Sequence, residues 1–481
     1  MTTLLPDTSA APFDQLASRL IGRLVTPSDP DYPSVAVPWN VAVPSTPVAV
    51  VIAACTDDVV AAVRFASEHG LLVDVRATGH GAIPTAAPTL LVHTGDLDAL
   101  EVHPEERWAR VGAGVRWQRV LDAAAPHGLT GLCGSAPHVG VVGYITGGGL
   151  SPIGRNFGFA IDHVRAFELV TATGRVLRVT ADQHPDLFWA LRGGKGSVGI
   201  ITAVEIDLLP VATIYGGALY FAADDIATVL HRWAEWAPAL PDAASTSVAI
   251  LRLPPLPDVP PPLAGRTVLA VRYTWLGDPA EGDAVFAPVA GAATPVLGGI
   301  GPMPTTAFGA IHAEPVDPMP AVEYGHLLRE LPAEAVDALL AIAGPDVECP
   351  LAMVELRLLG GALRRRSAPA VFDRRDDAFS LLAIGLGVPP VAAAATAVAS
   401  SLLTATSRWS DGAQLPHFGG TLTADRLPKV FRPDALQNLA RLAELHDPRH
   451  VLTATVALRS FSGKDTVYRD LVATTVPDLW D

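Results

Sequence analysis

The sequence predicts an α+β protein with two sheet-containing regions, and three observations support this prediction. Between residues 48 and 210, short β-branched apolar runs alternate with helical segments and tight turns. Between residues 211 and about 415, longer aromatic strands alternate with helices, as is typical of an antiparallel sheet covered by helices. A chain of 481 residues, 49% of them apolar, is long enough for two or three domains.

In the first region we expect a strand at 48–54, a helix at 57–69 and a strand at 71–75. Thr56 is a candidate N-cap of this helix because its hydroxyl can accept a hydrogen bond from a free backbone N–H. The remaining expected strands are 89–93, 100–103, 108–112, 163–171, 176–180 and 200–208, and the remaining expected helices are 117–125 and 186–192.

The second region and the end of the chain contain longer elements. We expect strands at 215–221, 267–275 and 353–359 and helices at 225–236, 333–342, 394–406 and 435–445. Proline-rich loops such as 254–262 separate them, which fits a turn-rich globular fold rather than a disordered chain.

Charge and cysteine content exclude several classes of function. With 34 Lys and Arg against 49 Asp and Glu, the net charge is -15, which argues against nucleic acid or an anionic membrane as the main partner. The widely spaced Cys55, Cys133 and Cys349 predict neither a disulfide framework nor a metal site. Because neither a signal peptide nor a membrane-spanning run is evident, we expect a soluble, cytoplasmic protein.

A short loop with two glycines around one histidine follows the strand at 71–75. Its backbone N–H groups can form a concavity for an anion such as a pyrophosphate, and Arg76 can add charge at its entrance. His80 would then lie beside the bound group as a nucleophilic side chain. The alternative is an ordinary strand-ending turn with a solvated histidine.

Two further glycine-rich segments distinguish the first region. The stretch 131–149 is too rich in glycine for a stable helix, and its Val, Tyr and Ile residues are unlike a flexible linker, so it suits a loop around a large planar or phosphorylated ligand. Gly194, Gly196 and Gly199 form a GxGxxG pattern, but a helix precedes it and a strand follows. That order is the reverse of a Rossmann dinucleotide site.

Five motifs follow one another along the first region: Arg76-Ala77-Thr78-Gly79-His80, Val139-Gly140-Val141-Val142-Gly143, Gly147-Gly148-Gly149, Gly158 with Asp162, and the segment 186–194. In this order and spacing they resemble one known family, the FAD-linked oxidases of the vanillyl-alcohol-oxidase/PCMH superfamily, specifically the berberine-bridge-enzyme-like group. The resemblance covers about residues 19–452 and is strongest over 29–210.

The resemblance implies a PCMH-type FAD-binding domain of two α+β subdomains at 1–210, a substrate-binding domain at 211–415 on an antiparallel sheet covered by helices, and a C-terminal return at 416–481. It also implies FAD covalently bound through His80. The implied cofactor-binding residues are Arg76, Ala77, Thr78, Gly79, His80, Gly81, Ala82, Ala136, Val139, Gly140, Gly143, Tyr144, Gly147, Gly148, Gly149, Gly199, Ile200 and Ile201.

The sequence departs from the family pattern at the second attachment point of the flavin. Some members carry a cysteine there, whereas Ala136 occupies the matching position here and Cys133 lies three residues too early. We therefore expect a single covalent bond, through His80. A loop shift that lets Cys133 substitute is the alternative.

A second departure affects proton transfer. Many relatives have Tyr-x-Asn-Phe near the flavin, but the matching stretch here is Leu415-Pro416-His417-Phe418. Candidate catalytic residues are therefore His417, whose ordinary pKa suits a general base, Glu355 and Tyr144. Glu355 alternates with Arg357 along one strand face, so this pair can equally be structural.

The resemblance implies an FAD-dependent oxidase. It would remove hydride from a C–H next to a hydroxyl or amine of a small organic or natural-product substrate, as in bacterial-type secondary metabolism, with molecular oxygen as the acceptor. The alternatives are a flavin dehydrogenase with another acceptor and a catalytically weakened flavin-binding protein, which the missing tyrosine suggests.

Overall fold

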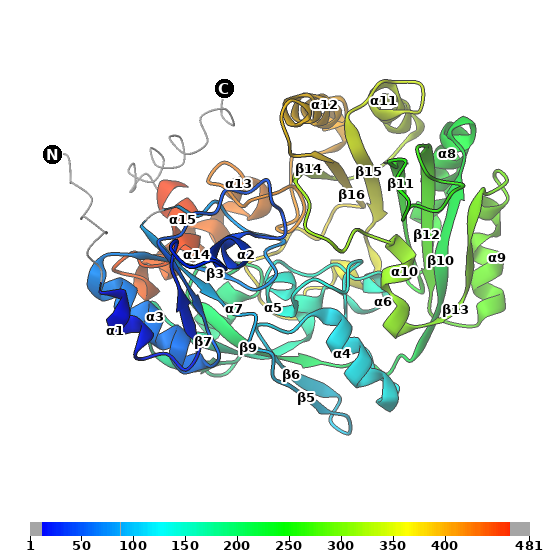
Figure 1. Ribbon diagram of the computed structural model, residues 1–481. Helices are drawn as coiled ribbons and strands as arrows, with labels where there is room; N and C mark the ends of the chain where they lie inside the picture. Colours follow the sequence, from blue (N-terminus) through cyan, green and yellow to red (C-terminus); the bar gives the residue numbers. More distant parts are fainter. Residues whose placement is uncertain (1–11, 87, 462–481) are drawn as a thin grey trace.

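The computed structural model describes residues 12–86 and 88–461 and contains three β-sheets with helices packed around them (Figure 1). Within these residues, no helix is both long and apolar enough to cross a bilayer. The mixed α+β architecture with a large antiparallel sheet confirms the predicted fold class.

The first sheet has four strands in the order β1-β2-β4-β3: Arg23–Val25, Ala49–Ile52, Thr89–His93 and Leu72–Arg76. Strands β2, β4 and β3 are parallel, and β1 runs antiparallel to β2. The helices of this part are α1 Phe13–Ala17, α2 Tyr32–Ala36 and α3 Thr56–His69. The N-cap prediction is wrong, because Cys55 is the N-cap and the Thr56 hydroxyl, inside the helix, donates to Glu168 Oε1 at 2.8 Å.

The second sheet has five antiparallel strands in the order β5-β6-β9-β7-β8: Leu100–His103, Trp108–Gly112, Ile200–Asp207, Val164–Val170 and Val176–Val179. Its helices are α4 Trp117–Ala124, α5 Val141–Ile145, α6 Gly154–Phe157 and α7 Pro185–Leu191. Because α7 precedes Gly194 and β9 follows Gly199, the inverted order that excludes a Rossmann site is confirmed. The glycine-rich stretch 131–149 includes the short helix α5, which the sequence did not predict.

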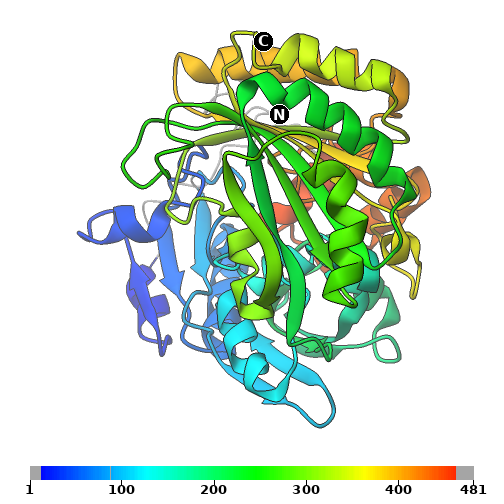
Figure 2. The same ribbon diagram turned by 90° about the vertical axis from the view of Figure 1, so that its right-hand side faces the viewer.

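The third sheet has seven antiparallel strands in the order β13-β10-β12-β11-β15-β16-β14: Leu297–Pro304, Thr213–Phe221, Thr267–Trp275, Ala244–Arg252, Leu351–Leu358, Phe379–Leu386 and Ala321–Leu328. Its helices are α8 Ile226–Trp236, α9 Pro279–Ala290, α10 Gly309–His312, α11 Ala333–Ala343 and α12 Val391–Ala405. Helices α8, α9, α11 and α12 cover the side of the sheet that faces away from the first two sheets (Figures 1 and 2). A separate apolar core fills the space beneath them.

The C-terminal helices are α13 Leu427–Val430, α14 Pro433–His446 and α15 Val456–Phe461. Between α14 and α15 the chain returns to the free edge of the first sheet, where Val73 N–H donates to Val451 O at 2.7 Å and Val73 forms a parallel bridge with Leu452. The Thr453 hydroxyl also donates to Val73 O at 3.1 Å. The last part of the described chain therefore packs beside the strand that leads into the His80 loop.

Candidate functional site

The loop after β3 is held in shape by the N-terminal arm. Gly79 has φ +83°, and a Cβ on it would lie 2.8 Å from Trp39 N and 2.9 Å from Pro38 Cα. Trp39 N–H donates to Thr78 O at 3.3 Å. Only glycine fits at position 79, because a side chain there would meet both left-handed strain and backbone atoms.

His80 lies on top of this loop, stacked on Trp39 with ring centroids 4.5 Å apart and an 18° angle between planes. Its Nδ1 is 2.9 Å from Thr78 Oγ1, while its Nε2 is buried without a hydrogen-bond partner in the described part of the chain. Burial, with smaller contributions from His138 and Arg116, lowers the pKa of His80 to about 3. His80 is therefore a neutral imidazole, held by Trp39 and Thr78, with one nitrogen available for a bound group.

The Arg76 side chain does not lie at the entrance of the His80 loop, where it was expected to add charge. Its guanidinium is 4% exposed and donates to Ala36 O and to Ser45 Oγ at 3.1 Å. It also lies 3.7 Å from the buried Asp74 carboxylate. The positive charge of Arg76 is therefore paired inside the first sheet. The expectation that Arg76 adds charge to a ligand on the loop is wrong.

An open surface borders the His80 loop, and we call it the glycine shelf: Gly81, Gly140, Gly143 and Lys195. A Cβ on Gly143 would meet no described atom within 4 Å, and one on Gly81 would meet only Lys195 Nζ at 3.9 Å. Gly140 packs against the His80 loop, because a Cβ built on Gly140 would lie 3.6 Å from Thr78 Oγ1. A flat group can therefore approach the backbone closely on this shelf.

Lys195 is the residue of the shelf that the sequence did not predict. Its ammonium lies 3.3 Å from Gly143 O, and burial, with a contribution from Arg426, lowers its pKa to about 8. In the sequence, Lys195 lies within Gly194-Lys195-Gly196, part of the GxGxxG pattern that does not form a Rossmann site. A single cation among glycines was the sequence signal for its place here, because such a cation can pair with an anionic ligand.

The other predicted cofactor residues differ in their surroundings. Gly149 lies on the Tyr144 ring, because a Cβ built on it would be 2.6 Å from a ring carbon. Gly199 packs against β7, and the side chains of Ile200 and Ile201 lie in apolar cores, so only their backbone is available to a ligand. The remaining predicted cofactor-binding residues lie in the His80 loop or in the glycine-rich stretch 131–149. They are Ala77, Thr78, Ala82, Ala136, Val139, Gly147 and Gly148.

His417 reaches this region from the C-terminal part of the chain. Its Nδ1–H donates to Gly147 O at 2.6 Å, and its Nε2 is buried with no partner among the described residues. Burial, followed by the charge of Lys195, lowers the pKa of His417 to about 3. The expectation of an ordinary histidine pKa is therefore wrong, and a neutral His417 is suited to accept a hydrogen bond rather than a full proton.

Tyr144 and Glu355 are also poorly suited to act as bases. The Tyr144 hydroxyl is buried, unpartnered among the residues described, and burial raises its pKa well above 10. Both Glu355 oxygens already accept hydrogen bonds at 2.6 Å, one from Arg272 and one from Arg357. Because both of its oxygens are already bound to guanidinium groups, Glu355 has no oxygen directed at a substrate and acts as a structural partner of the two arginines.

Cys133 is placed as expected for a residue that is not attached to a cofactor. It is fully buried in the apolar core, and its thiol donates to Gly134 O at 3.2 Å. Burial raises the pKa of the Cys133 thiol well above its usual range. Because the thiolate is the reactive form, this environment makes the thiol inert.

Comparison with known proteins agrees with these features. Residues 47–180 match a family described as the FAD binding domain. The FAD-linked oxidoreductase ZEB1 of Gibberella zeae is 36% identical over 184 residues, which cover 36% of this chain and 33% of that protein. The crystal structure of 6-hydroxy-D-nicotine oxidase from Arthrobacter nicotinovorans aligns with TM-score 0.78 and 23% identity, covering 90% of this chain and 96% of that one. BBE-like 1 from Physcomitrella patens aligns with TM-score 0.79 and 18% identity, covering 92% and 98% of the two chains.

Residues 47–180 therefore form an FAD binding domain, and the chain has the fold of these solved FAD-linked and BBE-like structures. The matched FAD binding domain includes the His80 loop, Gly140 and Gly143, so the glycine shelf is part of it apart from Lys195. The chain spans between a third and about half of the length of the first curated relatives that it matches. The family match establishes the FAD-binding domain over 47–180, and the aligned structures establish the fold.

Proposed function

We propose that this protein is an FAD-dependent oxidase that removes hydride from a C–H next to an amine or a hydroxyl of a small organic molecule, with oxygen as the final acceptor. The observation that carries the proposal is the open glycine shelf. His80 Nε2 lies at one side of it, and His417 Nε2 and the Tyr144 hydroxyl lie in the adjoining loops; none of the three has a hydrogen-bond partner among the described residues. FAD supplies the hydride-accepting ring when bound.

The residues of the shelf fit FAD. Backbone N–H groups of the loop 77–81 and the Lys195 ammonium would hold the diphosphate or another anionic part of the cofactor. The free Nε2 of His80 would form a single covalent bond to the flavin ring, since Ala136 offers no sulfur and Cys133 is buried. We accordingly assign 1–210 and 416–481 to cofactor binding and 211–415 to the substrate.

Because His417, Tyr144 and Glu355 are poorly suited to remove a proton, we expect a substrate whose oxidation needs little help from a base. Neutral His417 can accept a hydrogen bond through Nε2 and Tyr144 can donate one, so both can orient a polar group. A neutral amine needs no deprotonation, whereas an alcohol must lose a proton to a group better suited than these. This argument favours amines over alcohols, in line with the relative named for 6-hydroxy-D-nicotine.

Flavin reduction and peroxide release with a panel of cyclic amines and alcohols test the proposal. We expect the bound flavin to lose its oxidised absorbance on mixing with an amine substrate and to regain it in air, with hydrogen peroxide formed. Flavin that reduces but remains reduced in air would indicate a dehydrogenase with another acceptor. Flavin that no substrate reduces would favour a protein that only binds the cofactor.

A further inference from the structure

The face of the seven-stranded sheet that is turned toward the FAD-binding region is polar. Along β11, β12 and β15, alternate residues enter the apolar core beneath the helices, as Tyr273 and Leu356 do. The residues between them face the other way and include, beside the apolar Ala249 and Ala270, six polar residues that are all at least nine-tenths buried: Ser245, Ser247, Arg272, Thr274, Glu355 and Arg357. Folding removes such groups from water only at a cost, so this face needs an explanation.

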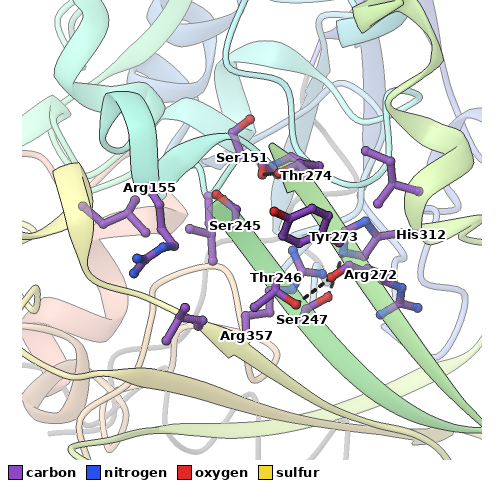
Figure 3. A pocket seen from close by; sticks show the side chains of 15 residues that line it. Ser151, Arg155, Ser245, Thr246, Ser247, Arg272, Tyr273, Thr274, His312 and Arg357 are labelled. Carbon is purple, nitrogen blue, oxygen red and sulfur yellow. Dashed lines mark hydrogen bonds between the residues drawn. The ribbon is translucent and has the colours of Figure 1, made fainter. Parts of the chain in front are cut away.

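All of these polar side chains except Glu355 line one cavity, and Figure 3 labels them. Arg272 and Arg357 line it from the two strands that flank Ser247, which pairs with Arg272 on one side and with Arg357 on the other. Two such strands lie about 10 Å apart, so the two guanidinium groups can reach one small group between them.

No carboxylate is among the described residues that line the cavity. Glu355 lies outside the lining and binds both Arg272 and Arg357 at 2.6 Å, so it fixes the two guanidinium groups; we call these three residues the arginine clamp. Together these three residues carry a net charge of +1, from two guanidinium groups and one carboxylate. Glu314 approaches Arg357 only to 3.7 Å, with 34% of its side chain exposed to solvent.

Three polar atoms around the cavity are buried with no hydrogen-bond partner in the described part of the protein. They are Arg272 Nε, Ser245 Oγ and His312 Nδ1. Because a buried polar group without a partner costs free energy, binding of a ligand that bonds to these atoms would be favoured. Arg155 also lines the cavity, but it donates to backbone carbonyls, including those of Ala244 and Leu359, and serves as a support.

The cavity adjoins the candidate flavin site. Arg357 donates to Ser135 Oγ at 3.3 Å and lies over the Phe418 ring, with its guanidinium carbon 5.0 Å from the ring centroid. Phe418 is next to His417, and the lining residue Leu150 is next to Gly149. A molecule held here by one end would extend toward His417 and Tyr144.

We propose that the arginine clamp and Ser245 bind a carboxylate group of the substrate, so that the protein oxidises carboxylate-bearing amines or alcohols. A carboxylate accepts paired hydrogen bonds from guanidinium groups, is opposite in sign to the net charge of the arginine clamp and needs no proton from the protein. This inference rests on the proposed function, because it names the substrate class of the same site.

Binding of simple carboxylates to the flavin-containing protein tests this inference. Acetate, propionate and benzoate are each compared with the corresponding amide, and dissociation constants are read from the change in flavin absorbance. We expect at least tenfold tighter binding of the carboxylate for at least one of the three pairs. Equal binding within every pair would overturn the proposal.

Variants identify the residues responsible. Arg272→Met is expected to reduce the preference for carboxylate to less than threefold, and Ser245→Ala to reduce it severalfold. If Arg272→Met does not fold, Arg272→Lys keeps the charge but loses the paired donors and should show an intermediate preference. Arg252→Met is the matched control, because Arg252 lies on the same strand as Ser245 but donates to the carbonyls of Ala343 and Gly344.

The outcomes separate this inference from the proposed function. If substrates reduce the flavin but Arg272→Lys and Ser245→Ala leave the carboxylate preference unchanged, the clamp is only structural and the inference fails alone. If carboxylates bind with the expected preference but no substrate reduces the flavin, the proposed function fails while the carboxylate site remains.

Discussion

The two sides of the candidate site differ in how they are made. The side formed by the first two sheets presents backbone, glycine and a neutral histidine, His80, whereas the seven-stranded sheet presents the arginine clamp. The side formed by the first two sheets suits a cofactor, because a cofactor must be held in the same position in every catalytic cycle. The second suits the recognition of a charged substrate, because a charge pattern discriminates between molecules of similar shape. Changes on the first side should therefore affect cofactor retention, and changes on the second should affect stability and substrate choice.

His80→Ala is expected to have the largest effect, because the proposed covalent bond has only one donor atom. Acid-denatured wild-type protein should keep its yellow colour in the precipitate, while denatured His80→Ala should release the flavin completely. Cys133→Ala is the control and should retain the colour. Loss of colour in the control, or retention in His80→Ala, would show that the attachment lies elsewhere.

Glu355→Gln should strongly destabilise the other side of the site. It leaves Arg272 and Arg357, which are buried, without their shared carboxylate, and removing one partner of a buried ion pair costs about 3–5 kcal/mol. The free energy of unfolding in urea measures this. Glu205→Gln removes the partner of the exposed Arg178 and should cost at most about 1 kcal/mol. Similar losses in the two variants would contradict a buried, charge-dependent clamp.

Two glycine substitutions on the cofactor side should act differently. Gly79→Ala places a methyl group 2.8 Å from Trp39 N at φ +83° and should reduce stability by about 1–3 kcal/mol. Gly143→Ala meets no described atom within 4 Å, so it should leave the melting temperature of flavin-free protein unchanged but reduce flavin content. If Gly143→Ala binds flavin normally, position 143 does not face the cofactor.

The smallest effect should be a change in pH dependence. The folded pKa of His417 is about 3, below its ordinary value of about 6.5, so the unfolded chain binds more protons between these values. Stability should therefore be complete above about pH 6.5 and fall as the pH decreases toward 3. In His417→Asn the free energy of unfolding should depend less steeply on pH, and the difference in slope should correspond to up to about one bound proton. Urea unfolding from pH 4 to 7 measures this slope. An unchanged slope would show that His417 does not titrate in this way.

Sequence reasoning succeeded where the signal was local. The strands at 89–93, 100–103 and 108–112 have the predicted bounds, because apolar periodicity and turn residues specify them directly. It failed for Thr56, whose hydroxyl has a distant partner, Glu168, that no local rule contains. It also gave His417 an ordinary pKa, since the burial and the neighbouring Lys195 ammonium that lower it come from other parts of the chain.

The sequence by itself determined the glycine loops and the place of His80 among them, because backbone freedom and close approach depend on the residue type at each position. Only the tertiary structure decided that the Arg76 charge is used inside the first sheet, that Lys195 lies over the glycine shelf and that Arg272 and Arg357 face one cavity. The physical reason is that charge and burial act through space, so their effects depend on which distant segments the fold brings together.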